Sequence, residues 1–471
     1  MNGMIKEKAR QNRTALAVIG AAVCVIIGFI LCWLLMTYKY PMLKEPAFQN
    51  FTASYHQVMN DYLDGAKAED LINGASEGML ASLGDPYSKY MSGELGEAYT
   101  QGYKPDFSGV GAEVSQEGTK FVIQKVVKDT PAEKGGVLPY DVITAVDNTP
   151  VEGKTLQQLT DMLRGEKGTK VKLTLQRPKA EKPVEIELTR DTIPVVTVTS
   201  EMLPGGIGHV TISKFADKTA DEFNQAIDEL QKDQPLKGLL LDLRSNPGGL
   251  LTPTIDIANK LVPKGKEIVQ VVYKDEKKVY TYKSNQKQPW TVPIVVLVNG
   301  QSASASEVLT AALKESAGAK VIGEKTFGKG IVQQFRQFKD GSVLSLTEAQ
   351  WKSPNGEWIH KKGIEPDETV KLPDYAYLPY ISGTDLKQGA YGDDVKTIQT
   401  LLSLLGYSPV GDAGYFSGQT ADALRAFQAA EGLDRTGVYD SATAHTLMDT
   451  MQQKLKQEDT QLQQGLKELE K

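Results

Sequence analysis

An uncharged run near the N-terminus constrains this chain more than any other feature, because residues 15–36 form 22 positions without a charge. As an α-helix at about 1.5 Å per residue, the run would be about 33 Å long, enough to cross a hydrocarbon core of about 30 Å. Four basic residues precede it: Lys6, Lys8, Arg10 and Arg13. Because basic residues favour the cytoplasmic side, we predict a cytoplasmic tail over residues 1–14, a transmembrane helix over residues 15–38 and the rest of the chain outside. A cleaved signal peptide is the alternative, but no small-residue cleavage site follows the run.

Composition argues against several kinds of site in the exported part. The chain has 471 residues and a net charge of -6, so no basic surface for nucleic acid is expected. The two cysteines, Cys24 and Cys32, both lie inside the apolar run. The exported part therefore has no disulfide, no thiol nucleophile and no cysteine metal site. The four histidines include no pair at metal-ligand spacing, and we expect neither a metal nor a cofactor.

Hydrophobic periodicity divides the exported part into five regions. Residues 45–103 carry apolar positions at helical spacing, and the turn GDPYSKYM closes this region. Residues 104–195 alternate short β-branched runs with glycine turns around one amphipathic helix. Residues 196–372 alternate strand and helix, residues 381–450 form a small, mostly helical segment, and residues 451–471 form a charged helical tail. This order predicts a multidomain α/β protein.

A serine-rich loop in the third region is the first candidate for chemistry. The apolar run PIVVLVN predicts a buried strand, and it leads through GQSASAS into a helix. The loop thus follows the carboxyl end of a strand, where α/β sheets place their sites. Ser304 and Glu307 also match the S-x-x-E capping box, which needs no catalysis. The loop alone therefore leaves a nucleophile and a helix cap as alternatives.

Two further stretches add groups that a serine nucleophile would need. In LLLDLRSNPGGLL, Gly248 and Gly249 follow a second apolar strand and could offer backbone N–H groups as an oxyanion hole. By itself, this stretch favours the alternative of an ordinary Asn-Pro-Gly-Gly turn. In GEKTFGKGIVQQFRQF, Lys329 and Gln333 would point the same way in an extended run. A lysine acts as a general base only if burial lowers its pKa, and most lysines are solvated.

Two other kinds of site need consideration, a phosphate loop and a serine–histidine pair. GEKTFGKG approaches the phosphate loop G-x-x-x-x-G-K-[ST], but Gly330 occupies the hydroxyl position and a β-rich run follows instead of a helix. Nucleotide binding is therefore disfavoured. A serine–histidine pair that uses His209 or His360 remains an alternative to the lysine.

Taken in order, these motifs resemble those of the carboxyl-terminal processing proteases, serine peptidases with a Ser-Lys dyad. The similar stretches are GMLASLGDPYSKYM, FSGVGAEV through LTRDTI, LDLRSNPGG, VNGQSASASE, GEKTFGKGIVQ and GIEPD. The resemblance implies a PDZ domain of the β-sandwich-like kind over residues 104–195 and a crotonase-like α/β protease core over residues 196–372. It also implies a homodimer through the N-terminal helices and the C-terminal part.

The same resemblance assigns roles to individual residues. Ser304 would be the nucleophile, Lys329 the general base and Gln333 the third catalytic member. The oxyanion hole would use the N–H of Ala305 and one N–H of the Gly248-Gly249 turn.

In the region that resembles a PDZ domain, FSGVGA matches the loop that holds a peptide's terminal carboxylate. Such domains add the C-terminus of a peptide to a sheet edge as an extra strand. Gly109, Val110 and Gly111 are the candidate contacts, and the expected partners are proteins or peptides with free C-termini. Arg164 in LRGEKGT is a candidate for relaying peptide binding to the protease, with a solvated loop arginine as the alternative.

Residues 381–450 resemble the three-helix peptidoglycan-binding domain of cell-wall enzymes, which makes peptidoglycan a candidate partner. The whole chain is thus predicted to be a serine endopeptidase in the cell membrane that faces the wall and processes exported or membrane proteins from their C-terminal region. Two alternatives stay open, an inactive PDZ and wall-binding scaffold and a crotonase-like acyl hydrolase.

Overall fold

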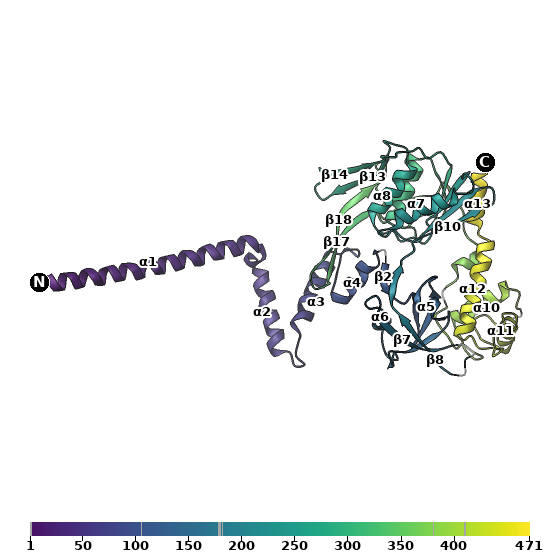
Figure 1. The fold of residues 1–471 in the computed structure, drawn as a ribbon, viewed down its shortest axis with the longest axis horizontal. Coiled ribbons are helices and arrows are strands. Elements are labelled where there is room, and N and C mark those ends of the chain that lie inside the picture. The colour runs from purple at the N-terminus through teal and green to yellow at the C-terminus, as the bar shows by residue number, and fades with distance from the viewer. Residues whose placement is uncertain (1, 105, 178–179, 181, 380, 409–410) are drawn as a thin grey trace. The chain divides into compact units, whose positions relative to one another are not determined.

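The computed structural model describes residues 2–104, 106–177, 180, 182–379, 381–408 and 411–471. They form two compact units, one of Met1–Gly93 with Gln337–Ser345 and the other of Glu94–Arg336 with Leu346–Lys471. Figure 1 shows the elements along the chain from α1 to α13. The predicted multidomain α/β architecture is confirmed.

The first unit begins with a long helix, α1 (Asn2–Lys39). Within it, Ile19–Lys39 has a mean hydropathy of 2.7 and is long and apolar enough to cross a membrane, the one such helix among the described residues. The unit also contains η1 (Pro41–Lys44), α2 (Pro46–Asp61), α3 (Ala68–Ala81) and β1 (Lys89–Met91).

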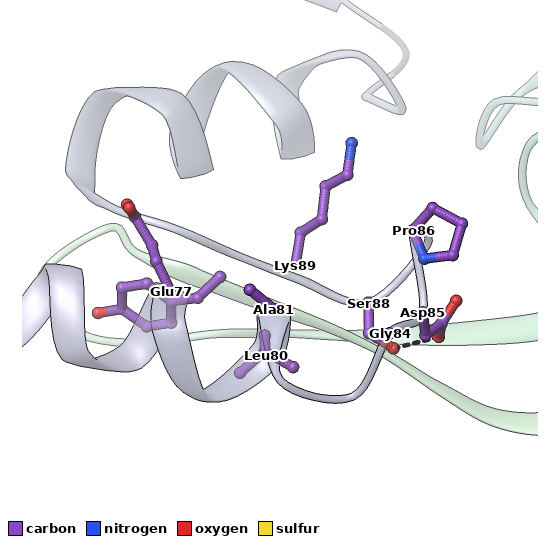
Figure 2. A pocket seen from close by; sticks show the side chains of 9 residues that line it. Glu77, Leu80, Ala81, Gly84, Asp85, Pro86, Ser88 and Lys89 are labelled. Atoms are coloured by element: carbon purple, nitrogen blue, oxygen red, sulfur yellow. Dashed lines mark hydrogen bonds between the residues drawn. The ribbon is translucent and has the colours of Figure 1, made fainter.

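The stretch GDPYSKYM, expected as a turn, ends in strand β1. Asp85 forms the turn by accepting hydrogen bonds from the Tyr87 N–H at 3.0 Å and the Ser88 hydroxyl at 2.6 Å. The next residues then pair antiparallel with β18 (Val343–Lys352), with Lys89 opposite Ser345. A pocket of about 480 Å³ lies between the end of α3 and this turn (Figure 2), and none of the candidate catalytic residues lines it.

In the second unit, the segment predicted as a PDZ domain contains an antiparallel sheet in the order β3-β4-β5-β7-β8. The bounds of these strands are Ala112–Glu117, Lys120–Val126, Val142–Val146, Lys170–Gln176 and Val184–Thr189. Their alternating apolar side chains and those of α6 (Leu156–Leu163) form one buried core. Strand β3 ends the sheet, and α6 contacts it, so β3 has a free edge beside a helix.

The remaining elements of this segment are short. They are β2 (Asp106–Gly109), α5 (Pro131–Lys134), β6 (Thr149–Pro150) and β9 (Asp191–Pro194), with β2 and β9 paired antiparallel. Helix α4 (Gly93–Gln101) precedes them.

The protease-like core is built on a six-stranded sheet in the order β10-β11-β12-β15-β16-β19, parallel except for the β10-β11 pair. Its strands are Val198–Leu203, Ile207–Ile212, Gly238–Asp242, Ile294–Val298, Lys320–Gly323 and Glu368–Thr369. Helices α7 (Thr219–Leu230), α8 (Leu251–Leu261) and α9 (Ala305–Ser316) follow strands β11, β12 and β15 and share one hydrophobic core with the sheet.

A second sheet brings distant segments together beside this core. It pairs β13 (Glu267–Tyr273) with β14 (Val279–Lys283) and with β18, which also pairs with β17 (Ile331–Gln337). The loop before β17 carries Lys329, so this sheet positions the proposed base.

The C-terminal part is helical, as predicted. Helices α10 (Asp393–Leu404), α11 (Gly418–Ala430) and α12 (Ser441–Gln457) share a core that includes Val395, Ile398, Leu401 and Leu402. A short helix η2 (Asp374–Tyr377) precedes them, and α13 (Thr460–Leu469) follows. Helix α13, yellow in Figure 1, contacts β12, β15 and β16 of the protease-like sheet.

Candidate active site

Ser304 is the accessible member of the three serines in the GQSASAS loop. Ser302 is buried and donates its hydroxyl to the Leu243 carbonyl at 2.8 Å, while Ser306 is buried and donates to the Asn246 carbonyl at 2.9 Å. Ser304 is half-buried and precedes the first residue of α9, with φ 56° and ψ -115°. Such a backbone is costly for a residue with a side chain and is found most often at functional sites. The structure therefore favours Ser304 as the nucleophile of this loop.

Glu307 has more hydrogen-bond partners than the capping-box interpretation predicted. Its side chain is fully buried, and one carboxylate oxygen accepts the Ser304 N–H at 2.8 Å and the Lys329 N–H at 2.8 Å. The other oxygen accepts the Thr326 hydroxyl at 2.5 Å and the Gly328 N–H at 2.7 Å. Burial raises the pKa of Glu307, and these four hydrogen bonds oppose the rise. The carboxylate arm of the predicted capping box thus also ties the proposed base loop to the nucleophile loop.

Lys329 lies in the loop between β16 and β17 and is half-buried. Its carbonyl accepts a hydrogen bond from Trp351 Nε1 at 2.9 Å, and the next carbonyl, that of Gly330, accepts one from Trp358 Nε1 at 2.8 Å. The backbone at Lys329 is therefore held by Glu307 on its N–H side and by indoles on its carbonyl side. The contact between the Lys329 ammonium and the Ser304 hydroxyl stays a prediction.

Gln333 lies on β17, and its side-chain amide donates to the Thr347 hydroxyl on β18 at 3.3 Å. The parity argument assumed one extended run through Lys329 and Gln333, but β17 begins at Ile331, two residues after the lysine. The predicted contact between Gln333 and Lys329 stays a prediction.

The two candidate glycines differ in what they face. Gly248 has φ 100°, and a Cβ placed on it would lie 2.8 Å from the Ser304 Cβ and 3.0 Å from the Ala305 nitrogen. A Cβ on Gly249 would instead lie 2.0 Å from the Phe215 carbonyl oxygen. Gly248 is thus the glycine that packs against Ser304. Its N–H donates to Asn246 Oδ1 at 2.9 Å.

The histidines of the alternative dyad contact other groups. His209 Nδ1 lies 3.0 Å from Glu201 and its Nε2 lies 3.6 Å from Asp242. Burial alone would lower the pKa of His209, but these two carboxylates raise it. His360 Nδ1 accepts the Gly330 N–H at 3.3 Å. Within the described part of the chain, no group of three or more His, Cys, Asp or Glu side chains could hold a metal ion.

The candidate peptide-binding loop lies at the start of the free-edged strand β3. Gly109 ends β2, Val110 is buried, and Gly111 has φ 86°, where a Cβ would lie 2.3 Å from the Thr130 Cβ. The Val110 carbonyl accepts the Ala132 N–H at 2.8 Å, so the backbone of α5 holds the loop in place. This placement agrees with a carboxylate-binding loop that leads into an edge strand.

Arg164 is half-buried at the end of α6. Its guanidinium carbon lies 5.5 Å from the centre of the Phe107 ring, a cation–π contact with β2. The buried Arg164 Nε has no hydrogen-bond partner among the described residues. These contacts argue against the alternative of a solvated loop arginine.

Comparison with known families matches four consecutive parts of the chain. Residues 38–95 match the N-terminal domain of the activating protease CtpB, residues 108–188 a PDZ domain, residues 206–370 peptidase family S41, and residues 391–447 a putative peptidoglycan-binding domain.

Similar whole proteins follow the same pattern. The carboxy-terminal processing protease CtpA of Bacillus subtilis is 41% identical over 428 residues, covering 91% of each chain. CtpB of the same organism is 38% identical over 434 residues, covering 90% of each chain. Among solved structures, the photosystem II D1 C-terminal processing protease is 32% identical with a TM-score of 0.41, over 69% of this chain and 88% of the other. The sequence identity, sustained over nine-tenths of both chains, shows that this protein belongs to the carboxy-terminal processing proteases, serine-type peptidases of family S41.

Proposed function

We propose that this protein is a membrane-anchored endopeptidase in which Ser304 is the nucleophile, Lys329 the general base and Gln333 the residue that orients the lysine. The observation that carries the proposal is the buried Glu307 carboxylate, one oxygen of which binds the N–H groups of both Ser304 and Lys329. This shared oxygen supports a site in which the two residues meet, although 24 residues separate them along the chain.

In the proposed reaction, neutral Lys329 takes the proton of the Ser304 hydroxyl as the oxygen attacks the scissile carbonyl. The lysine then donates the proton to the leaving amine, which departs and leaves an acyl-enzyme. In the second half of the reaction, neutral Lys329 takes a proton from the attacking water and returns it to the Ser304 oxygen as the acyl group leaves. The negative charge of each tetrahedral intermediate would develop at the N-terminus of α9, where the N–H groups and the dipole of the helix favour it.

The oxyanion hole would be formed by the N–H groups of Ala305 and Gly248. Ala305 begins α9, and Gly248 packs against it and against Ser304. Because the Gly248 N–H donates to the Asn246 side chain here, it must leave that oxygen to serve an oxyanion. The resting loop and the catalytic loop would therefore differ at this one hydrogen bond.

The PDZ domain would gate the protease. A substrate C-terminus would add to β3, with its carboxylate at Gly109, Val110 and Gly111. Arg164 lies at the end of α6, the helix that contacts β3, and its contact with Phe107 joins this helix to the strand that leads into the carboxylate loop. A peptide that displaces either element would thus change the surroundings of Arg164.

We further propose that α1 anchors the protein in the cell membrane, with its N-terminus in the cytoplasm and the protease on the outer side. The helix supports a signal anchor or a membrane span by length and composition, and the basic residues before it favour this orientation. The peptidoglycan-binding-like domain would then lie within reach of the cell wall. Dimerisation through the N-terminal helices and the C-terminal part completes the proposal.

The test is cleavage of an unfolded protein by residues 40–471, in which wild type is compared with Ser304→Ala and Lys329→Ala. Lys325→Ala is the matched control, because Lys325 lies in the same loop but is exposed and pairs with Glu365 at 2.6 Å. Both catalytic variants should lose cleavage while they stay folded, and the control should retain it. Cleavage that survives Ser304→Ala contradicts the proposal, and hydrolysis of thioesters without peptide cleavage would favour an acyl hydrolase.

A further inference from the structure

The tail helix α13 is an integral part of the protease core. Side chains alternate along a strand, so one face of the sheet packs against α7, α8 and α9, and the other face offers Leu240, Val295 and Leu297 to α13. Leu462, Leu466 and Leu469 of the helix cover these residues. A Cβ on Gly465 would lie 2.7 Å from Leu240 Cδ1, so the helix approaches the sheet closely at that point.

The start of α13 places two polar groups on Arg244, which lies two residues after the end of β12. Arg244 Nη1 lies 3.0 and 2.8 Å from the two carboxylate oxygens of Asp459 and 3.0 Å from Gln461 Oε1. Gln461 is fully buried and donates to the Val370 carbonyl at 2.7 Å, so its oxygen is oriented toward the arginine. Asp459 is 9% exposed and also caps α13 by accepting the Leu462 N–H at 2.9 Å.

The other side of Arg244 is held by Asp242. The guanidinium donates to both carboxylate oxygens of Asp242, at 2.6 to 3.1 Å, and the Arg244 N–H donates to Asp242 Oδ1 at 3.0 Å. Arg244 is therefore held between the Asp242 carboxylate at the end of β12 and the Asp459 carboxylate at the N-cap of α13. Such charge-assisted bonds are the strong and directional ones in proteins.

The loop that follows Arg244 leads directly to the residues around the nucleophile. Ser245 has φ 58°, and its N–H is held by Asn299 Oδ1 at 2.8 Å. The carbonyl of Asn246 accepts the Ala303 N–H at 3.0 Å and the Ser306 hydroxyl at 2.9 Å, on both sides of Ser304. A continuous series of contacts thus runs from α13 through Arg244 and this loop to the nucleophile.

We propose that Asp459 and Gln461 are positioning residues of the peptidase, which hold Arg244 so that the loop over residues 245–248 stays in register with Ser304. The inference rests on the proposed function for its catalytic consequence, but the ordering of the loop is measurable without any substrate. The tail helix thereby contributes to the same site as the nucleophile, although 154 residues lie between Ser304 and Asp459.

The test uses the full-length protein in detergent with the substitution Asp459→Asn. Asparagine keeps an N-cap oxygen for α13 but removes the charge that faces Arg244, so the variant separates the two roles of Asp459. Gln464→Ala is the matched control, because Gln464 lies on the same helix and bonds to Glu368 at 3.0 Å, away from Arg244. Gln461→Ala provides the second variant, should Asp459→Asn fail to fold.

Two readouts decide the proposal. Amide hydrogen exchange over residues 244–249 and 303–306 should become faster in Asp459→Asn and stay unchanged in the control. Peptide cleavage should show a kcat about tenfold lower with KM nearly unchanged, as expected when one bond to a charged group is weakened. Unchanged hydrogen exchange in a folded variant overturns this proposal, whether or not the wild type cleaves peptides. If the proposed function fails instead, the wild type will be inactive, but the difference in exchange between wild type and variant will remain. Faster exchange with unchanged kcat overturns the catalytic role.

Discussion

The substitution Gly248→Ala tests the close approach between the glycine turn and the nucleophile. The added Cβ would lie 2.7 Å from the Ala303 carbonyl oxygen, 2.8 Å from the Ser304 Cβ and 3.0 Å from the Ala305 nitrogen. All three distances are well below the roughly 3.5–4.0 Å at which non-bonded carbon atoms attract. The neighbours are backbone atoms and the first side-chain carbon of the nucleophile, so none can move aside without moving the site.

The expected effect of Gly248→Ala has two sources, backbone strain and steric overlap. The φ of 100° at Gly248 costs a residue with a side chain about 1–3 kcal/mol, and overpacking adds about 1–3 kcal/mol. Because the strain is relieved by displacing Ser304 or the proposed oxyanion donors, we expect kcat/KM to fall by about 10²–10³, as for loss of one oxyanion donor.

The control variant Gly265→Ala separates the backbone strain from the steric overlap. Both variants are compared with wild type in peptide hydrolysis and in thermal unfolding. Gly265 has φ 83° in an exposed turn between α8 and β13, but a Cβ on it would meet nothing within 4 Å. The control should therefore lose stability from backbone strain and keep its kcat/KM. A folded Gly248→Ala enzyme with kcat/KM within about threefold of wild type would refute the placement of Gly248 against the nucleophile.

Three further predictions concern groups around the site. Glu307→Ala leaves four donors without their acceptor, so we expect cleavage to fall by more than about 100-fold and stability to fall by about 2–5 kcal/mol in chemical denaturation. Burial alone would raise the pKa of Asp242, but His209 and Arg244 lower it from 3.8 to about 2, so its ionised form stabilises the fold above pH 3.8. About 2 kcal/mol should be lost as pH falls from 3.8 to 2 in acid unfolding, and Asp242→Asn should lack this loss. Arg164→Ala should change peptide-stimulated cleavage relative to basal cleavage. If basal and peptide-stimulated cleavage both stay at their wild-type rates, Arg164 has no part in the gating.

The sequence predicted the elements whose signals are local. The apolar run that became β15 and the helix α9 after it placed Ser304 correctly at a strand end, because both patterns lie within about 20 residues. From the sequence, Glu307 was predicted only to cap α9. Its other partners, Gly328 and Lys329, belong to a loop that comes close only in the folded protein. A single carboxylate among the small and apolar residues that begin α9 was the available signal.

Long-range pairing explains the other differences. Strand β1 was expected as part of a turn because three residues give little strand signal, and its partner in β18 lies some 250 residues away. The tail was described by its charge, yet Leu462, Leu466 and Leu469 at spacings of four and three residues make one apolar helix face. That spacing indicates a helix that packs, but only the structure shows that the protease sheet is its partner.

The S-x-x-E capping box and the proposed catalytic site share the side chain of Glu307. A capping box has two arms, and the arm in which the glutamate side chain binds the N–H of the cap residue does not use the serine hydroxyl. Here that arm binds the Ser304 N–H, and the same carboxylate oxygen binds the Lys329 N–H. The helix N-terminus is thereby stabilised by a group that also fixes the base loop. The side chain that caps α9 thus also connects two segments of the proposed active site that are distant in the sequence.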